Sequence, residues 1–191
     1  MGKLDTLDLF EPQDREAWGR WLEENHATSP GVWLAVRKKH GRHAGPFYAE
    51  AVEEALRFGW IDGTVRRLDE DRFRQLFTPR RPQSTWSASN KQRVERLLAQ
   101  GRMEPAGMAA VETARANGSW DALTDAEALV VPPDLAAALQ SSPGIARQFE
   151  AIAESRRAAI LYWISAARRP ETREARIAAS LAALAEGRSP I

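Results

Sequence analysis

The stretch WIDGTVRRLDEDRFRQLFT, residues 60–78, carries two runs of β-compatible residues separated by three acidic ones. Residues 60–68 and 72–78 are rich in aromatic and β-branched side chains, and residues 69–71 supply a polar turn between them. Pro79 ends the second run because proline has no N–H group to donate to a sheet. The stretch therefore predicts an antiparallel hairpin, and with it a sheet in the N-terminal part of the chain.

The residues before the hairpin predict two helices around one strand. Trp18, Trp21 and Leu22 recur at helical spacing within residues 12–26. Residues 32–38 form a continuous apolar run typical of a buried strand, and residues 48–58 return to the helical period, with Gly59 placed as a left-handed cap.

The residues after the hairpin predict helices only. One begins after residues 84–90 and ends near Gly101, and another runs from Pro105 to about residue 117. Further helical signals cover residues 135–139, 145–152, 155–167 and 171–186. The fold class is therefore α+β: a small sheet containing an antiparallel hairpin packed with helices (residues 1–125), followed by an all-helical C-terminal module (residues 126–191).

Composition excludes several classes of protein. The 191 residues are 43% hydrophobic and 28% charged, which is ordinary for a soluble protein. No window approaches eighteen uncharged apolar residues, so we expect no membrane span. Acidic residues from Asp5 onward do not fit a secretory signal, and we expect a cytoplasmic protein. The absence of cysteine rules out disulfides and thiolate sites.

Charge is unevenly distributed along the chain. The formal net charge is +1, yet residues 64–102 hold ten basic and four acidic side chains. Such a concentration attracts anionic partners although the whole protein is nearly neutral. A small anionic ligand is therefore the first class of partner to consider, with a protein partner as another.

The segment TPRRPQSTWSASNK, residues 78–91, is the strongest candidate for an anion site. Arg80 and Arg81 offer planar donor forks for phosphate or carboxylate, Ser84 and Ser87 add hydroxyl donors, and the next helix presents its N-terminus. The alternative is structural, with the serines as caps and Trp86 in the core. The candidate ligand-binding residues here and in the hairpin are Trp60, Asp62, Arg66, Arg80, Arg81, Ser84, Trp86, Ser87, Asn90 and Lys91.

Two of these residues have competing interpretations. Asp62, beside Gly63, is a candidate to orient an arginine or to act as a general base, or else it accepts backbone N–H groups at a turn. Arg66 shares the hairpin arms with Arg72 and Arg74; paired across the strands, these cations repel unless Asp69, Asp71 or an external anion intervenes. The hairpin arginines then form either a ligand site or a solvated face with local ion pairs.

The sequence gives little support for a metal site, a nucleotide-binding loop or a serine-hydrolase motif. His40 and His43 have a spacing that fits a metal, but no third ligand is near in the sequence. Glycine-rich phosphate loops and G-x-S-x-G elbows are absent from the sequence. We therefore expect no metal and no cofactor.

Several motifs together resemble the YdeI/OmpD-associated family, also called bacteriocin-protection proteins. They are ALRFGWIDG (55–63), RRLDEDRF (66–73), FTPRRPQSTWSASNKQRVERL (77–97), GRMEPAGMAAVE (101–112) and ILYWISAARRPETREARI (160–177). The resemblance implies a recurrent polar set at Asp62, Arg80, Ser84, Ser87 and Asn90, beside Trp60 and Trp86. It implies a second set at Glu171, Thr172, Arg173 and Arg176; Ala175 stands where the family often has a basic residue.

The resemblance implies a role in bacterial stress resistance, including resistance to bacteriocins or antimicrobial peptides, with no assigned molecular activity. The leading hypothesis is a non-enzymatic protein that binds an anion through Arg80 and Arg81. One alternative is an enzyme acting on a phosphorylated or carboxylated small molecule with Asp62 as general base. Another is nucleic-acid binding through residues 64–102 with Trp60 or Trp86 stacking on bases, which the near-neutral net charge disfavours.

Overall fold

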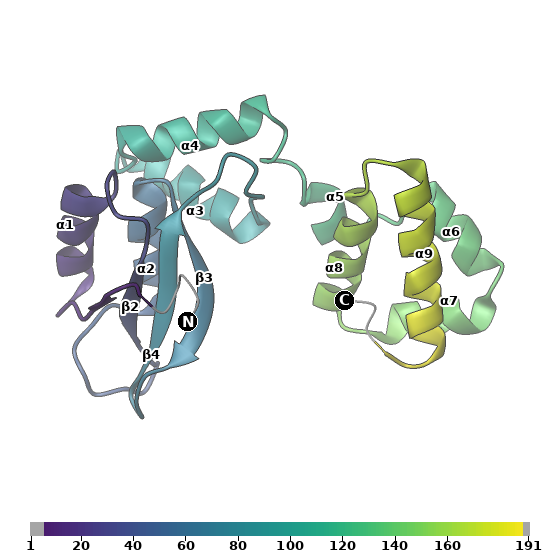
Figure 1. Ribbon diagram of the computed structural model, residues 1–191, viewed down its shortest axis with the longest axis horizontal. Helices are drawn as coiled ribbons and strands as arrows, with labels where there is room; N and C mark the ends of the chain where they lie inside the picture. The colour runs from purple at the N-terminus through teal and green to yellow at the C-terminus, as the bar shows by residue number, and fades with distance from the viewer. Residues whose placement is uncertain (1–5, 189–191) are drawn as a thin grey trace. The chain divides into compact units, whose positions relative to one another are not determined.

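The computed structural model describes residues 6–188, which form two compact units (Figure 1). The N-terminal unit comprises Met1–Ser84 and Ser89–Trp120, and the C-terminal unit comprises Thr85–Ala88 and Asp121–Ile191. A sheet packed with helices occupies the first unit and helices alone form the main part of the second. The predicted α+β class with a helical C-terminal module is confirmed.

The sheet has the strand order β1-β2-β4-β3. The predicted hairpin is β3 (Trp60–Arg67) and β4 (Arg72–Pro79), which pair antiparallel. β2 (Val32–Arg37) lies between β4 and the short β1 (Leu9–Phe10), antiparallel to the former and parallel to the latter. Five of the six β2 residues are buried, as expected for an apolar run in a central strand.

Helices α1 (Arg15–Asn25) and α2 (Tyr48–Arg57) pack against each other, and α2 also contacts β2 and β3. The ring of Trp18 lies 5.4 Å from that of Phe77 on β4, which joins α1 to the sheet core. Gly59 ends α2 with φ of +74°, as its predicted role as a left-handed cap requires. The chain continues through α3 (Ala88–Ala99) and α4 (Pro105–Ala116).

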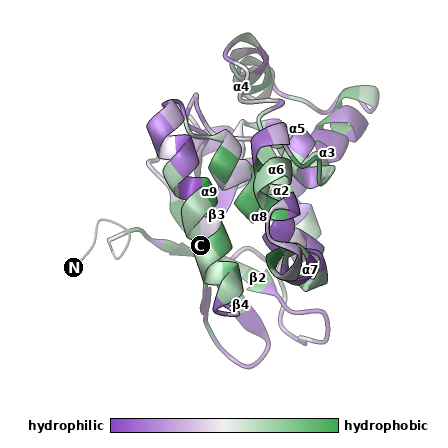
Figure 2. Cartoon of the chain, turned by 90° about the vertical axis from the view of Figure 1, so that its right-hand side faces the viewer, coloured by the Kyte–Doolittle hydropathy of each residue, from purple (hydrophilic) through white to green (hydrophobic). Residues whose placement is uncertain are grey.

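The C-terminal unit is built from α5 (Thr124–Glu127), α6 (Pro133–Gln140), α7 (Pro143–Ala151), α8 (Glu154–Ser165) and α9 (Pro170–Ala185). Prolines open α6, α7 and α9, where the missing N–H is harmless. Helix α9 shows both hydrophobic and hydrophilic residues along its length, because only one of its faces is buried (Figure 2). The hydrophobic core of the C-terminal unit consists of Ala126, Leu135, Leu139, Phe149, Ile160, Leu161, Ile164 and Leu184.

Two elements were not predicted. β1 has two residues, too few for a periodic pattern, and exists because Leu9 and Phe10 pair with Trp33 and Leu34. α5 has four residues, which are also too few for a periodic pattern. None of the helices within residues 6–188 is long and apolar enough to cross a membrane.

Candidate functional site

Asp62 and Tyr48 form a hydrogen-bonded pair. Asp62 lies on β3 opposite Phe77, next to a bulge that separates it from Val65, and Tyr48 is the first residue of α2. The Tyr48 hydroxyl donates to Asp62 Oδ2 at 2.7 Å. Burial, and then the hydrogen bond and charge of Asp62, raise the pKa of Tyr48 to about 12. Tyr48 therefore keeps its proton at neutral pH and acts as a donor to Asp62.

Arg80 follows the last residue of β4 and lies near Asp62. Its backbone N–H donates to the carbonyl oxygen of Gly59 at 3.0 Å, which fixes the chain after Pro79. Burial lowers the pKa of Arg80 to about 10, while the negative charge of Asp62 acts in the opposite sense. Arg80 is thus a half-buried cation that still carries its charge at neutral pH.

Helix α3 contributes a second guanidinium group. Arg93 lies close enough to Tyr48 for its charge to oppose, in part, the rise in the pKa of that residue. Arg93 Nη1 donates to Asn90 Oδ1, three residues earlier, at 3.1 Å. We call Tyr48, Asp62, Arg80, Asn90 and Arg93 the Asp62 cluster; its two cations and one carboxylate leave an excess of positive charge.

Arg81 and Ser84, both predicted site residues, are engaged in a local turn. The backbone N–H of Arg81 donates to Ser84 Oγ at 3.2 Å, and that of Ser84 donates to the carbonyl oxygen of Arg81 at 2.9 Å. The Arg81 side chain is exposed. The Ser84 hydroxyl thus serves this local turn.

The two predicted tryptophans lie in the core. Trp60 is 1% exposed, and its indole Nε1 donates to the carbonyl oxygen of His26 at 3.2 Å. Trp86 is also 1% exposed, and with Ser87 it belongs to the Thr85–Ala88 segment of the C-terminal unit. At this exposure neither indole ring is available for stacking on a base.

Arg66 and Lys91 each approach a different tryptophan. Arg66 lies directly opposite Arg74 in the hairpin, and both guanidinium groups lie over the ring of Trp33, at 5.1 and 4.9 Å from its centre. The Lys91 ammonium lies 5.5 Å from the centre of the Trp120 ring. Cation–π attraction to the Trp33 ring thus partly offsets the predicted repulsion between the hairpin arginines.

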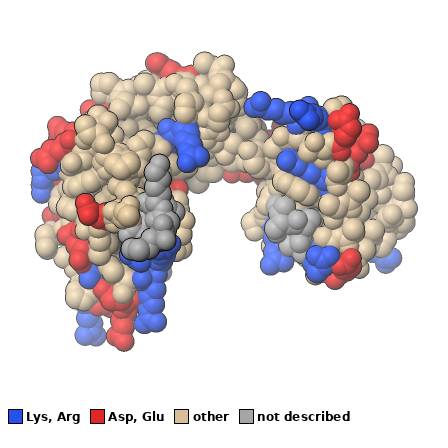
Figure 3. Space-filling view, in the orientation of Figure 1, with Lys and Arg blue, Asp and Glu red and all other residues tan. Residues whose placement is uncertain are grey.

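The basic segment does not form one continuous cationic face. At the far end of the hairpin, acidic and basic side chains lie side by side (Figure 3). Acidic partners from outside or within the segment neutralise several of its arginines. These pairs are Arg72 with Asp69 and Glu11, Arg96 with Glu53, and Arg102 with Glu54.

A second site of the N-terminal unit was missed by the sequence analysis. Glu54 on α2 is 2% exposed, and its carboxylate accepts hydrogen bonds from Arg15 Nε at 2.5 Å and Arg102 Nη2 at 2.6 Å. Arg57 Nη1 donates to the other carboxylate oxygen. Burial acts to lower the pKa of Arg15 and of Arg57, but the bonds to Glu54 outweigh it and raise both above the ordinary value.

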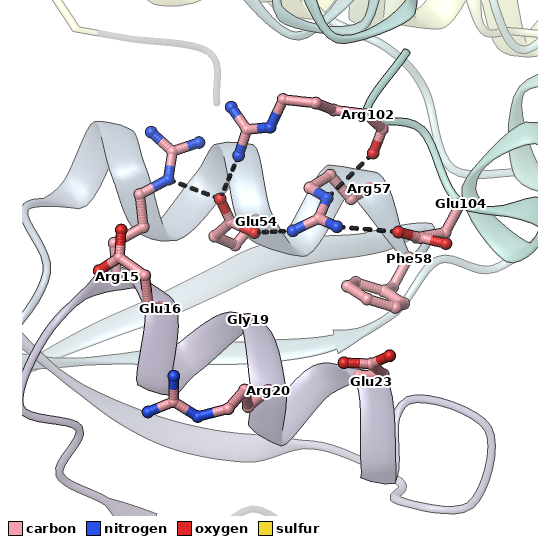
Figure 4. A pocket seen from close by; sticks show the side chains of 10 residues that line it. All are labelled: Arg15, Glu16, Gly19, Arg20, Glu23, Glu54, Arg57, Phe58, Arg102 and Glu104. Carbon is pink, nitrogen blue, oxygen red and sulfur yellow. Dashed lines mark hydrogen bonds and ion pairs between the residues drawn. The ribbon is translucent and has the colours of Figure 1, made fainter. Parts of the chain in front are cut away.

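The Glu54 carboxylate lies at the wall of a pocket of about 260 Å³ (Figure 4). Helix α1 forms one side, α2 another, and the segment after α3 closes the third. We call it the Glu54 pocket. It is lined by Arg15, Glu16, Gly19, Arg20, Glu23, Glu54, Arg57, Phe58, Arg102 and Glu104. One signal was available in the sequence, since Glu54 falls among the apolar residues Ala51, Ala55 and Phe58 on the buried face of a helix.

The arginines of the C-terminal motif hold helices together. Arg173 on α9 donates from Nε and Nη2 to the Asp134 carboxylate at 2.5 and 2.9 Å, and from Nη1 to the carbonyl oxygen of Ile164 at 3.3 Å. Arg176 Nη1 donates to the carbonyl oxygen of Trp163. Both arginines therefore satisfy carbonyl groups at the C-terminal end of α8.

Within residues 6–188 no group of three or more histidine, aspartate or glutamate side chains is placed to hold a metal ion. His43 lies 3.7 Å from Asp71 and His40 is exposed.

The fold and its polar clusters define a two-unit protein, with an α+β unit that carries clusters of charged side chains and a helical module. Residues 10–110 match the model of a family described as Domain of unknown function (DUF8412), and residues 128–187 match that of Bacteriocin-protection, YdeI or OmpD-Associated. The chain belongs to the DUF8412 family and carries a YdeI/OmpD-associated module at its C-terminal end. No curated protein and no solved structure matches it significantly.

The family resemblance is thus confirmed for the C-terminal part. The motif at residues 160–177 lies inside the YdeI/OmpD-associated match. The motifs at 55–63, 66–73 and 77–97 lie instead inside the DUF8412 match.

Proposed function

We propose that this protein is a non-enzymatic binding protein of bacterial stress resistance whose Asp62 cluster binds a phosphate or carboxylate group. The proposal rests on the half-buried guanidinium of Arg80 beside Asp62. Arg93 lies close to Tyr48, the tyrosine that donates a hydrogen bond to Asp62. Two cations accompany one carboxylate, and electrostatic attraction for an anion is stronger at a half-buried position than in water.

The chemistry of these side chains fits a small anion. A guanidinium fork matches the geometry of carboxylate and phosphate oxygens, so Arg80 and Arg93 are assigned the role of clamping the ligand. Asn90 lies within reach of Arg93 and offers amide donors. Tyr48 holds Asp62 in place, and Asp62 orients Arg80 through its charge.

A thermal-shift series with inorganic phosphate, sugar phosphates and nucleotides tests this binding. A ligand that binds only the native state raises Tm as its concentration grows. We expect a rise that Arg80→Ala abolishes and that Arg81→Ala, a change at the exposed neighbour, retains. The Tm of each variant without ligand is the reference for its own shift. An equal shift in chloride of the same ionic strength, or a shift kept by Arg80→Ala, would contradict the proposal.

The stress-resistance class is supported by the C-terminal match, whose description names bacteriocin protection. The test is survival of a bacterial strain that lacks this gene, challenged with bacteriocin or a cationic antimicrobial peptide. The wild-type gene should restore survival and the Arg80→Ala gene should not. Equal survival with and without the gene would remove the stress-resistance role while leaving anion binding to its own test.

An enzyme with Asp62 as general base is the second candidate, and the Tyr48–Asp62 hydrogen bond favours it. In such an enzyme the protonated Tyr48 hydroxyl would orient the carboxylate toward a substrate proton. If a bound metabolite is turned over, Asp62→Asn should abolish turnover while binding survives. A metabolite that binds and remains chemically unchanged over many hours would exclude this activity for that metabolite.

A further inference from the structure

We propose that the Glu54 pocket is a separate binding site for a small zwitterion of the free amino acid class. This site is independent of the Asp62 cluster, because none of the residues that line the pocket belongs to that cluster. The volume of about 260 Å³ lies just below the usual range for ligand pockets of about 300 to 1,000 Å³, so it suits a small metabolite rather than a nucleotide cofactor.

Hydrogen bonds among its own side chains connect the inner wall of the pocket. Glu54 is shared by Arg15, Arg57 and Arg102, as Figure 4 shows. Arg57 also donates from Nε to the carbonyl oxygen of Arg102 at 2.9 Å and from Nη2 to Glu104 at 2.8 Å. These bonds tie α1, α2 and the segment after α3 into one frame, so the pocket does not need a ligand to hold its shape.

Gly19 keeps one side of the pocket open. It lies inside α1, where glycine is less favourable than alanine. A Cβ atom at this position would lie 3.1 Å from Glu54 Oε2 and 3.7 Å from Arg57 Nη1. A side chain here would therefore press on the shared carboxylate and occupy pocket space.

The outer wall carries both signs of charge without protein partners. Glu16, Arg20 and Glu23 project from one face of α1. Glu16 and Arg20 have the spacing of a helical ion pair, yet Figure 4 shows them apart. Among the ion pairs and hydrogen bonds of residues 6–188, none involves the side chains of Glu16, Arg20 or Glu23.

This distribution of charge selects the class of ligand. Four arginines and four glutamates line the pocket, so a simple anion or a simple cation meets as much repulsion as attraction. A zwitterion satisfies both signs: its carboxylate pairs with Arg20 and with donors of Arg102, and its ammonium pairs with Glu16 and Glu23. The apolar part of an amino acid would contact Phe58, which lines the pocket and is 6% exposed.

The test is calorimetric titration of the whole protein with each of the free L-amino acids. For the amino acid that binds best, its methyl ester removes the negative charge and its N-acetyl form removes the positive charge. We expect both blocked forms to bind at least about tenfold more weakly, since a hydrogen bond to a charged group contributes more than one factor of ten in affinity. Equal affinity of either blocked form, or no binding by any amino acid, would overturn the proposal.

Variants locate the binding without disturbing the inner wall. Arg20→Gln and Glu23→Gln should each raise Kd about tenfold, on the same reasoning from charged hydrogen bonds. Glu24→Gln is the matched control, because Glu24 is exposed on the same helix and does not line the pocket. An equal effect of Glu24→Gln would overturn the assignment to this pocket. Arg80→Ala should leave amino acid binding unchanged, which separates this proposal from anion binding at the Asp62 cluster.

Discussion

The hydroxyl of Tyr48, at the start of α2, donates a 2.7 Å hydrogen bond to the carboxylate of Asp62 on β3, fourteen residues later in the chain. This bond joins the helix to the strand beside the bulge of the hairpin. Burial, and then this bond and the charge of Asp62, hold the proton of Tyr48 more tightly than in a free tyrosine, since ionisation would place two negative charges side by side.

The pair predicts how stability depends on alkaline pH. The pKa of Tyr48 is about 12 in the folded state and 10.0 ordinarily, so the folded state keeps a proton that the unfolded state loses between these values. The stabilisation from this pair is complete below pH 10 and decreases as pH rises toward 12. The difference in unfolding free energy between wild type and Tyr48→Phe should therefore decrease over this range.

Asp62→Asn is the companion variant, because it removes the negative charge but keeps an oxygen acceptor. It should bring the pKa of Tyr48 closer to 10.0, measured by ultraviolet titration with Tyr48→Phe as the reference for the other tyrosine. An unchanged tyrosine titration in Asp62→Asn would show that burial alone sets this pKa.

Much of the fold was predictable because its signals are local. The apolar run of β2, the polar turn of the hairpin and Gly59 each act through their own backbone preferences. The candidate site was predictable in part. Asp62, Arg80 and Asn90 fall in one cluster, but Tyr48 joins it only through tertiary packing, which no local pattern records.

The Glu54 pocket shows the limit of sequence reasoning more clearly. Arg15, Glu54 and Arg102 are separated by 39 and 48 residues along the chain, and three elements must fold before they meet. Periodicity marked the face of α2 as buried, yet it did not show which arginines would neutralise a carboxylate there. Trp60 and Trp86 illustrate the converse case, since residues that resemble ligand contacts in sequence are packed in the core.

The shared carboxylate of Glu54 predicts a large loss of stability on substitution. In Glu54→Gln, three guanidinium groups lose their common anion, and removing one partner of a buried ion pair typically costs about 3 to 5 kcal/mol. Glu53→Gln is the matched control: Glu53 pairs with Arg15 and Arg96 but is 23% exposed, and such pairs contribute about 0 to 1 kcal/mol.

Urea denaturation followed by tryptophan fluorescence measures both variants. Trp18, Trp21, Trp33, Trp60 and Trp120 all lie in the N-terminal unit, so the signal reports mainly on the unit that contains Glu54. Equal midpoints for Glu54→Gln and Glu53→Gln would show that the buried network does not stabilise this unit.

Gly107 predicts a steric effect at the contact between α4 and the end of α2. A Cβ atom at this position would lie 2.1 Å from the carbonyl oxygen of Arg57, well inside contact distance. Gly107→Ala should therefore lower the unfolding free energy by about 1 to 3 kcal/mol, as overpacking does. Gly144→Ala is the control, because a Cβ there meets nothing within 4 Å and alanine favours its helix. A thermal melt in which both variants resemble wild type would contradict this close contact.

Arg173 predicts that the recurrent motif of the C-terminal unit stabilises the fold rather than contacting a ligand. Its guanidinium bonds to both Asp134 oxygens on α6 and to the last turn of α8, and these bonds hold the pKa of Asp134 below its ordinary value. The stabilisation is therefore present above the ordinary pKa of 3.8 and is lost as pH falls through the lowered value.

Arg173→Ala and Asp134→Asn should each lower Tm at pH 7, and the double variant should lower it by less than the sum. The gap in Tm between wild type and Asp134→Asn should shrink below pH 3.8. Glu174→Ala, a change at the exposed neighbour, should alter nothing. Additive effects of the two substitutions would show that the 2.5 Å ion pair contributes no coupling between α6 and α9.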